Sequence, residues 1–365
     1  MHNDAVLVIV VATALAFDFT NGFHDTANVV ATSISTRAMA PRLAVAYAAA
    51  LNFAGAFISL AVAATVASDV VSSDAITPTV VFAGLIGAIA WNLITWYFGL
   101  PSSSSHALIG GVVGAAFAAA GADAVIGEGV LGKVLIPAIV APVVAFVIGA
   151  IAIVISYRVV GAERPGLVSR GYRLGQVVSG GLLALAHGTN DAQKTMGVIT
   201  LALITNGNLA ADSDPPTWVI VSAASAIALG TYSGGWRIIR TMGTRIIRMD
   251  PAQGFSASGA GAAVILASSH FGFPLSTTHV ISGGVTGAGA GKRLSAVRWG
   301  VAGDIVTAWL MTLPAAAAVG AVTYGVTRVF GTGWLGPAIV AAIALAFVAS
   351  AFVRRVRRGA PVPAP

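Results

Sequence analysis

The chain contains no cysteine, which excludes disulfide bonds and metal sites built from thiolates. It is also poor in charge, because Asp, Glu, Lys and Arg together make up 9% of its 365 residues, against about 25% in an ordinary soluble domain. A surface with so few charged side chains cannot face mainly water. Since 57% of the residues are hydrophobic, the composition predicts a protein whose main solvent is a lipid bilayer.

Apolar stretches that approach the length needed to cross a membrane recur along the whole sequence. A transmembrane helix needs ~20 mainly apolar residues, and roughly ten segments come near or exceed this length. They leave no stretch that resembles a soluble domain, so we expect an all-α polytopic membrane protein. The first apolar run contains Asp18 and leads into a polar motif, and we therefore do not expect it to be a cleaved signal peptide.

The positive charges are clustered, and their positions predict the orientation of the chain. Seventeen of the 20 Lys and Arg fall in five short segments, at residues 37–42, 158–173, 237–248, 292–298 and 354–358. Loops rich in Lys and Arg stay in the cytoplasm, so we expect a multi-pass protein of the cell inner (cytoplasmic) membrane, with its N-terminus outside and its C-terminus in the cytoplasm. The clusters also suit contacts with lipid headgroups, and they argue against nucleic acid as a partner despite a net charge of +7.

The order of the apolar segments predicts two inverted-topology repeats. Two pairs of apolar arms, at residues 79–121 and 254–290, have loops of one kind at both ends, acidic for the first pair and basic for the second. Each pair therefore forms a re-entrant hairpin, and the two hairpins open to opposite faces of the membrane. The predicted units are a first repeat at 1–160 with a broken span at 5–36, a cytoplasmic linker at 161–176, a second repeat at 177–298 with a broken span at 177–205, and closing spans with a basic tail at 299–365.

Two pairs of short motifs support the duplication. Residues 21–28 read Asn-Gly-Phe-His-Asp-Thr-Ala-Asn and residues 187–194 read His-Gly-Thr-Asn-Asp-Ala-Gln-Lys, so that a glycine and an aspartate align. The paired arms contain Pro-Ser-Ser-Ser-Ser-His at 101–106 and Pro-Leu-Ser-Thr-Thr-His at 274–279. We expect these motifs to lie within the membrane and to converge on one site.

Most of the 13 carboxylates lie in loops, and the exceptions are functional candidates. Those within apolar segments are Asp18, Asp25, Asp191 and Asp304. A carboxylate in the bilayer costs several kcal/mol unless it is paired, protonated or hydrated. Asp25 and Asp191 occupy equivalent places in the repeat. With amide oxygens from Asn28 and Asn190, they are predicted to hold the coupling ion, which is the ion whose movement would drive transport and is either a hard monovalent cation or a proton. A structural network explains the other two carboxylates equally well.

The polar motifs also suit an oxyanion. Gly22 and Gly188 beside the carboxylates predict that the helix is broken there, which exposes a helix N-terminus able to bind phosphate. Hydroxyl groups and one intramembrane lysine would add donors. The residues predicted to bind the substrate are Thr26, Ser103, Ser104, Ser105, Thr189, Gln193, Lys194, Ser276, Thr277 and Thr278. The residues predicted to relay protons, unless they are ordinary packed histidines, are His24, His106, His187 and His279.

With these motifs the chain resembles the inorganic phosphate transporter (PiT) family over nearly its whole length. In that family a Gly-x-Asn-Asp-x-x-Asn type signature occurs once per half, and the two motif sequences found here are similar to those of the bacterial low-affinity branch. His24 replaces the signature Asn in the first copy, and Gln193-Lys194 replace Ala-Asn in the second. The resemblance implies a homodimeric phosphate symporter without a cofactor, driven by protons, and it allows phosphate to travel as a neutral complex with a divalent metal.

Several alternatives stay open at this point. Sodium could replace the proton as the coupling ion, and sulfate or another tetrahedral oxyanion could replace phosphate. A passive anion channel is a further alternative. A membrane-embedded hydrolase is disfavoured, because the chain has neither His-Glu-x-x-His nor Gly-x-Ser-x-Gly, so we do not expect an enzyme. No residue is assigned to a resident metal.

Overall fold

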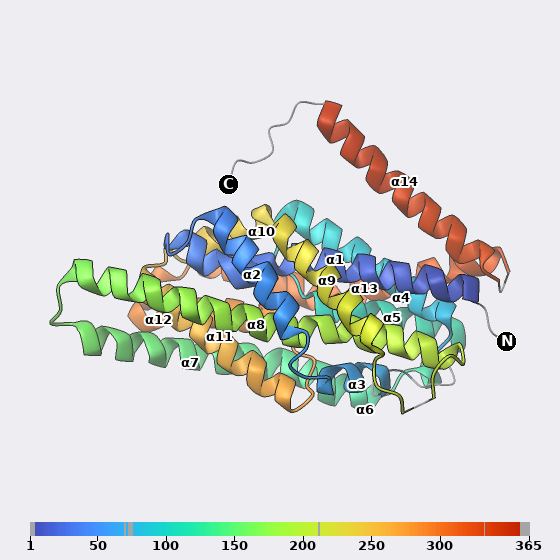
Figure 1. The fold of residues 1–365 in the computed structure, drawn as a ribbon, viewed down its shortest axis with the longest axis horizontal. Coiled ribbons are helices and arrows are strands. Elements are labelled where there is room, and N and C mark those ends of the chain that lie inside the picture. The colour runs from blue at the N-terminus through green and yellow to red at the C-terminus, as the bar shows by residue number, and fades with distance from the viewer. Residues whose placement is uncertain (1–3, 69–70, 72–75, 211, 332, 358–365) are drawn as a thin grey trace.

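The computed structural model describes residues 4–68, 71, 76–210, 212–331 and 333–357, and this part of the chain is almost entirely α-helical (Figure 1). Its helices are α1 (Asp4–Ser35), α2 (Pro41–Gly55), α3 (Ala61–Ser68), α4 (Pro78–Phe98), α5 (Ser104–Ala120), α6 (Gly127–Gly129), α7 (Ile136–Val160), α8 (Pro165–Thr205), α9 (Thr217–Ser233), α10 (Trp236–Arg240), α11 (Pro251–His270), α12 (Thr277–Lys292), α13 (Trp299–Val329) and α14 (Leu335–Arg357). The two pairs of arms predicted from the sequence correspond to α4–α5 and α11–α12.

The helices can be divided into the two series that the predicted duplication requires, and the duplication itself stays a prediction. The series α1, α2, α3, α4, α5 and α7 is followed by α8, α9, α10, α11, α12 and α13. Their contacts exchange between the halves, since α1 packs on α9 while α8 packs on α2, and α7 packs on α12 while α13 packs on α5. Each closing helix therefore supports the hairpin of the other half. In Figure 1, α14 runs away from this bundle. The opposite orientation of the two halves in a membrane stays a prediction.

The breaks expected in the spans at 5–36 and 177–205 are not found there, and this detail of the prediction is wrong. Both α1 and α8 are continuous helices through Gly22 and Gly188. A Cβ atom at Gly22 would lie 2.2 Å from the carbonyl oxygen of Ile227 in α9, and one at Gly188 would lie 2.1 Å from that of Asn52 in α2. These glycines let two helix backbones cross closely, which is a packing role that a sequence motif cannot separate from a helix break.

The helices break instead in the spans that follow. The helical segment Thr217–Ser233 meets Trp236–Arg245 at an angle of 59°, with Gly234 in the left-handed region at φ 72°. The corresponding span of the first half is interrupted between α2 and α3. The segment expected as a linker at 161–176 is also mostly helical, because α8 begins at Pro165, a residue suited to the first helical position.

The helices are those of a multi-pass membrane protein. Four helical segments of the described chain are long and apolar enough to cross a bilayer, or five if the bent pair is one span: Asp4–Ser35, Pro78–Phe98, Gly127–Val160 and Trp299–Val329, with the pair Thr217–Ser233 and Trp236–Arg245. Large apolar side chains on their outer faces are exposed, for example Ile139 and Leu310. Such a surface is stable against lipid and not against water.

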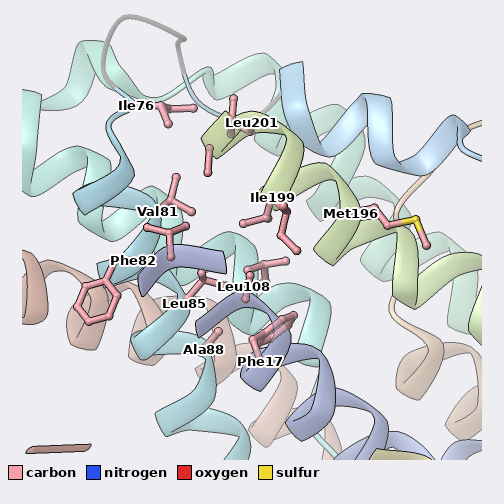
Figure 2. Packing of buried hydrophobic residues seen from close by; sticks show 14 of the residues in the cluster. Phe17, Ile76, Val81, Phe82, Leu85, Ala88, Leu108, Met196, Ile199 and Leu201 are labelled. Carbon is pink, nitrogen blue, oxygen red and sulfur yellow. The ribbon is translucent and has the colours of Figure 1, made fainter. Parts of the chain in front are cut away.

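Two clusters of buried apolar side chains lie on either side of the polar motifs. The first cluster includes Phe17 of α1, Leu85 of α4, Leu108 of α5 and Ile199 of α8, as Figure 2 shows. It involves α1 before its motif and α8 after its motif. The second cluster involves α1 after its motif and α8 before it, including Leu183. The polar residues of both motifs are therefore held in a layer between two close-packed apolar layers.

Candidate functional site

The two motif carboxylates meet at the N-terminus of α12. The hydroxyl of Thr277 lies 3.1 Å from Asp191 Oδ2 and 3.5 Å from Asp25 Oδ2. The hydroxyl of Thr278 lies 3.4 Å from Asp25 Oδ1. All four side chains are buried. Residues far apart in the sequence are thus brought to one place, which confirms their predicted convergence and leaves two acidic groups beside hydroxyl donors.

A serine caps the N-terminus of the second helix of each hairpin, α5 in the first and α12 in the second. Ser103 accepts a hydrogen bond from the backbone N–H of His106 at 3.0 Å, and Ser276 accepts one from that of His279 at 3.3 Å. This is the usual N-cap arrangement, in which the hydroxyl oxygen of the capping residue is occupied by a backbone N–H of the helix. The hydroxyls that follow each cap are the ones that reach the carboxylates and Lys194.

Lys194 links α8 to both hairpins. Its ammonium group donates hydrogen bonds to Asp191, to Ser105 Oγ at 2.6 Å and to the carbonyl oxygen of Leu275 at 2.8 Å. The lysine side chain is almost fully buried. A buried charge is tolerated only when it is paired and fully hydrogen-bonded, and these three acceptors meet that need. Lys194 therefore neutralises Asp191 and ties the tips of the two hairpins together.

Asn28 occupies the position of α1 that matches Lys194 in α8. Its amide nitrogen donates to Thr278 Oγ1 at 2.8 Å and lies 3.4 Å from Thr277 Oγ1. The amide therefore joins α1 to the hairpin of the second half, as Lys194 joins α8 to Ser105 of the first. In this arrangement the amide nitrogen, and not the oxygen expected for an ion ligand, faces the hydroxyls.

Two of the four histidines predicted to relay protons lie against the carboxylates. His24 Nδ1 is 2.6 Å from Asp25 Oδ1, and its Nε2 is 3.1 Å from Thr95 Oγ1. His187 Nε2 is 3.0 Å from Asp191 Oδ2. An imidazole that touches a carboxylate can exchange a proton with it, so the geometry suits the predicted relay at these two positions.

The other two histidines lie where the hairpins meet each other. The rings of His106 and His279 are 4.7 Å apart in an edge-to-face arrangement. His279 also stacks on Trp309 of α13, with centroids 3.9 Å apart, and its Nδ1 is 3.2 Å from the carbonyl oxygen of Ala138. These contacts pack the two hairpins together. The relay role predicted for this pair stays a prediction.

Two predicted substrate ligands support helix crossings instead. The hydroxyl of Thr26 donates to the carbonyl oxygens of Gly22 at 2.6 Å and Thr231 at 3.2 Å. The hydroxyl of Thr189 donates to the carbonyl oxygen of Gly55 at 2.8 Å. In both cases the donor satisfies backbone groups at a close crossing, so the structure does not bring these hydroxyls to the carboxylates.

Gln193 and Asn190 are also used by the scaffold. The side-chain oxygen of Gln193 accepts hydrogen bonds from the backbone N–H groups of Val62 at 2.8 Å and Ala63 at 3.2 Å, at the start of α3. The amide nitrogen of Asn190 donates to Ser269 Oγ at 3.0 Å. A polar residue in a motif thus serves a neighbouring helix end as readily as a substrate.

The structure adds Asn52 to the environment of the carboxylates. Asn52 Oδ1 lies 3.3 Å from Nδ1 of His187, and its amide nitrogen donates to Thr231 Oγ1 at 2.7 Å. The available signal was an asparagine within an apolar segment of the sequence, but this residue lies outside both repeated motifs. Asn52 orients the imidazole that contacts Asp191.

The same centre has the composition of a metal site. Asp25, His187 and Asp191 each offer one ligand atom, and these atoms lie within 4.8 Å of one another. Two carboxylates and an imidazole suit a divalent transition metal. Lys194 opposes this use, because its ammonium group already pairs with Asp191.

Paired buried carboxylates beneath two helical hairpins in a multi-pass membrane protein define the class of membrane transporters. Residues 21–320 match the phosphate transporter family, and the chain belongs to this family. Since the family is one of transporters, the alternative of a membrane-embedded hydrolase is set aside.

Similar proteins cover most of the chain. A "Probable low-affinity inorganic phosphate transporter" of Mycobacterium leprae is 54% identical over 350 residues, which cover 96% of this chain and 84% of that protein. Proteins of the same name from Rhizobium meliloti and Bacillus subtilis are 47% and 46% identical, over 87% of this chain and 96% of each relative. A solved structure described as "The sodium-dependent phosphate transporter" shares the fold, with a TM-score of 0.78 at 23% identity, covering 89% of this chain and 99% of that one.

Proposed function

We propose that the protein imports inorganic phosphate across a bacterial inner membrane as a secondary active transporter, by symport with protons. Its membership of the phosphate transporter family and the names of relatives that are 46–54% identical support phosphate as the substrate. We also propose the orientation predicted from the charges, with the N-terminus outside and the C-terminus inside, and a homodimer.

The observation that carries this proposal is the meeting of both hairpin tips with the two carboxylates and Lys194 in one buried layer. The first turns of α5 and α12 both begin there, and the first N–H groups of a helix have no partner within it. Ser104 Oγ is buried and has no hydrogen-bond partner among the described residues. Backbone N–H groups, hydroxyls and an ammonium group are the donors that a tetrahedral oxyanion needs.

Acceptors at the same place favour phosphate over sulfate. At neutral pH phosphate carries at least one proton and can donate a hydrogen bond, whereas sulfate is fully ionised. Asp25 lies within 3.5 Å of the hydroxyls of α12, so an oxyanion bound to those hydroxyls faces a carboxylate. A carboxylate accepts a hydrogen bond from phosphate and repels sulfate.

The choice of protons rests on the partners of the carboxylates. Lys194 already supplies a positive charge to Asp191, and the imidazole of His24 contacts Asp25, where it can pass a proton to or from the carboxylate. A sodium ion would have to share this space with the ammonium group. The related solved structure is described as sodium-dependent, and sodium is therefore the alternative that the experiment below must separate.

Transport of phosphate together with a divalent metal is a second candidate. The proximity of Asp25, His187 and Asp191 favours it, provided that Lys194 moves away from Asp191 when metal enters. Uptake of radiolabelled manganese should then depend on phosphate, and uptake of phosphate should depend on the metal. Phosphate uptake that is unchanged after the metal is removed with a chelator would exclude this candidate.

Uptake by the purified protein in liposomes tests the proposal. We expect labelled phosphate to accumulate against its gradient when the lumen is alkaline, to stop when an uncoupler collapses the pH gradient, and to be unaffected when choline replaces sodium. Excess unlabelled phosphate should compete and sulfate should not. Uptake that never exceeds equilibrium would indicate a passive anion channel, and uptake that requires sodium would contradict proton coupling.

Substitution of the two carboxylates assigns them to this activity. Asp25→Asn should abolish accumulation because it cannot hold the coupling proton, and Asp191→Asn should abolish it because it leaves Lys194 buried without its counter-ion. A matched control is Asp304→Asn, since Asp304 is an exposed carboxylate of α13. Normal accumulation by both site variants would remove the proposed roles.

A further inference from the structure

Asp18 is a third carboxylate in the membrane layer, and the transport site described above does not use it. It lies on α1 seven residues before Asp25, and its side chain is completely buried. Neither of its carboxylate oxygens has a hydrogen-bond partner among the residues that the structure describes. An ionised carboxylate in this state would cost several kcal/mol, so the group must be neutral or hold a cation.

The side chains beside Asp18 also present unsatisfied oxygen atoms. Asn21 on the same helix and Thr195 on α8 lie close enough to interact with its carboxyl group. Within the described part of the chain, Asn21 Oδ1 and Thr195 Oγ1 are both buried and without a partner. Four oxygen atoms from three side chains therefore meet in one place, and none of them is satisfied in the absence of a further ligand.

One proton satisfies all four oxygen atoms. A neutral Asp18 would donate its O–H to the amide oxygen of Asn21 and would accept a hydrogen bond from the hydroxyl of Thr195. A hard metal cation would require about six oxygen ligands, more than these side chains supply. The chemistry of the group therefore fits a proton better than a metal ion.

The residues next to this group in the sequence belong to an apolar cluster. Phe17 precedes Asp18 and Met196 follows Thr195, and both are fully buried members of the apolar cluster in Figure 2. In a dry environment the ionised form of a carboxylic acid cannot be stabilised by solvent. A proton on Asp18 then leaves only when another positive charge approaches.

The charged groups of α8 can supply that change. Among the helices packed against α1, the charged groups that act on Asp18 are Lys194 and Asp191. When Asp18 is neutral, the ammonium group of Lys194 remains with Asp191, Ser105 and the carbonyl oxygen of Leu275. An ionised Asp18 would attract the same ammonium group and weaken its contacts with both hairpin tips.

We propose that Asp18, Asn21 and Thr195 form a separate proton-binding site, and that Asp18 carries one of the protons moved with phosphate. This inference rests on the proposed proton-coupled function and adds a carrier of the proton to it. Deprotonation of Asp18 releases Lys194 from the hairpins, so that loss of the proton and opening of the phosphate site are linked.

The variant Asp18→Asn separates this role from transport itself. An asparagine has a similar shape, can still hydrogen-bond to Asn21 and Thr195, and mimics the neutral acid permanently. We expect it to exchange internal for external phosphate in liposomes, to accumulate phosphate to a lower ratio under the same pH gradient, and to move about one proton fewer per phosphate. Asp304→Asn, with an exposed carboxyl group, should keep wild-type coupling.

A spectroscopic readout does not depend on transport. Infrared spectra of the wild-type protein at neutral pH should contain the carbonyl stretch of a buried protonated carboxyl group, and Asp18→Asn should lack it while keeping its thermal unfolding temperature. Thr195→Val should shift the same band, because it removes a hydrogen bond to the carbonyl oxygen. If the wild type fails to take up phosphate, the proposed function is wrong, and the band still reports on Asp18.

Three results would overturn the inference. These are wild-type coupling in Asp18→Asn, an infrared spectrum that this substitution leaves unchanged, and thermal stabilisation of the wild type by sodium that Asp18→Asn abolishes. The last result would assign the oxygen cluster to a metal cation. If the Asp18→Asn protein does not fold, the infrared spectra of the wild type and of Thr195→Val decide whether Asp18 is protonated.

Discussion

The two halves of the molecule differ in the charge of the side chain at one position of their matching motifs. Asn28 of α1 and Lys194 of α8 both reach the hairpin of the other half, Asn28 through Thr278 and Lys194 through Ser105. One is a neutral amide and the other a cation. The two helices therefore make matching contacts with side chains of different charge, and Lys194 places a positive group on one side of the centre.

This difference extends to the two carboxylates. Asp191 is paired with Lys194 and lies against His187, whereas Asp25 lies against His24 and two hydroxyls. The charge of Asp191 is therefore compensated by the protein itself. Among the described residues no Lys or Arg pairs with Asp25, so its charge is not compensated in the same way.

The largest effect is expected from removing the unequal charge. Lys194→Ala leaves Asp191 buried without its cation, and loss of one partner of a buried ion pair costs about 3–5 kcal/mol. We expect a large drop in thermal unfolding temperature in detergent and no phosphate accumulation in liposomes. Normal stability would show that the ion pair is not formed in the resting protein.

A milder exchange makes the two halves alike. Lys194→Asn places in α8 the residue that α1 has at this position, and removes the fixed cation without leaving an empty space. We expect residual uptake that now depends on sodium, because Asp191 then needs a mobile cation. Uptake that stays independent of sodium would contradict the role given to the lysine charge.

The next effect should be equal in both halves. In Gly22→Ala and Gly188→Ala the new methyl group would meet a backbone oxygen at 2.2 Å and 2.1 Å, so the crossing helices must separate. Overpacking of this kind costs about 1–3 kcal/mol or more. Similar losses of thermal stability are expected for both variants, whereas a loss in one alone would break the equivalence of the two crossings.

A smaller effect is expected at the neutral position. Asn28→Ala removes hydrogen bonds to the hydroxyls of α12, which are worth about 1 kcal/mol or a several-fold change in an equilibrium. We expect a weaker apparent affinity for phosphate with coupling intact, measured as uptake against phosphate concentration. Loss of coupling would instead make this amide part of the ion site.

The smallest effect concerns the starts of the outer arms, α4 and α11. Asp250 caps α11. Burial raises the pKa of its carboxyl group, but hydrogen bonds from the Tyr157 hydroxyl, the Gln253 N–H and Lys292 outweigh burial and lower the pKa below its ordinary value. A lowered pKa gives stability that is present at neutral pH and is lost as the pH falls below the ordinary value of about 3.9. Lys292→Ala should cost about 0.2–1 kcal/mol at pH 7 and nothing once the carboxyl is protonated.

The matching start in the first half provides the control. Thr77 caps α4 through its hydroxyl, 3.3 Å from the N–H of Val80, and a hydroxyl does not titrate in this range. Thr77→Ala should therefore reduce stability by an amount that is the same at pH 7 and at low pH. A pH-dependent loss would contradict this assignment.

The arrangement of helices was largely predictable from the sequence, because membrane spans depend on long apolar runs and hairpins depend on breaks within them. The convergence of Asp25, Asp191 and the hydroxyls after 101–106 and 274–279 was also predictable, since duplicated polar motifs in apolar segments have few other uses. A sequence motif cannot show where one helix crosses another, and the glycines of both motifs were therefore misread as helix breaks.

The exact partners of the polar side chains could not be predicted for a related reason. Thr26 and Thr189 donate to backbone oxygens at the helix crossings, and Gln193 binds the start of α3, which are contacts across unrelated parts of the chain. Asn52 lies outside the repeated motifs and reaches His187 only through the packing of α2 on α8. Sequence motifs identify polar residues, while packing decides which of them remain available to a substrate.

The most direct test of the central claim, that the hairpin tips bind phosphate beside the carboxylates, uses the absence of native cysteine. In Ser104→Cys the single thiol replaces a hydroxyl that has no partner within the described chain, and its labelling by a small thiol reagent can be timed in liposomes. We expect saturating phosphate to slow labelling about tenfold and sulfate to leave it unchanged, with the exposed Ser233→Cys unaffected by either anion. An equal labelling rate with and without phosphate, in a protein that still takes up phosphate, would contradict the account.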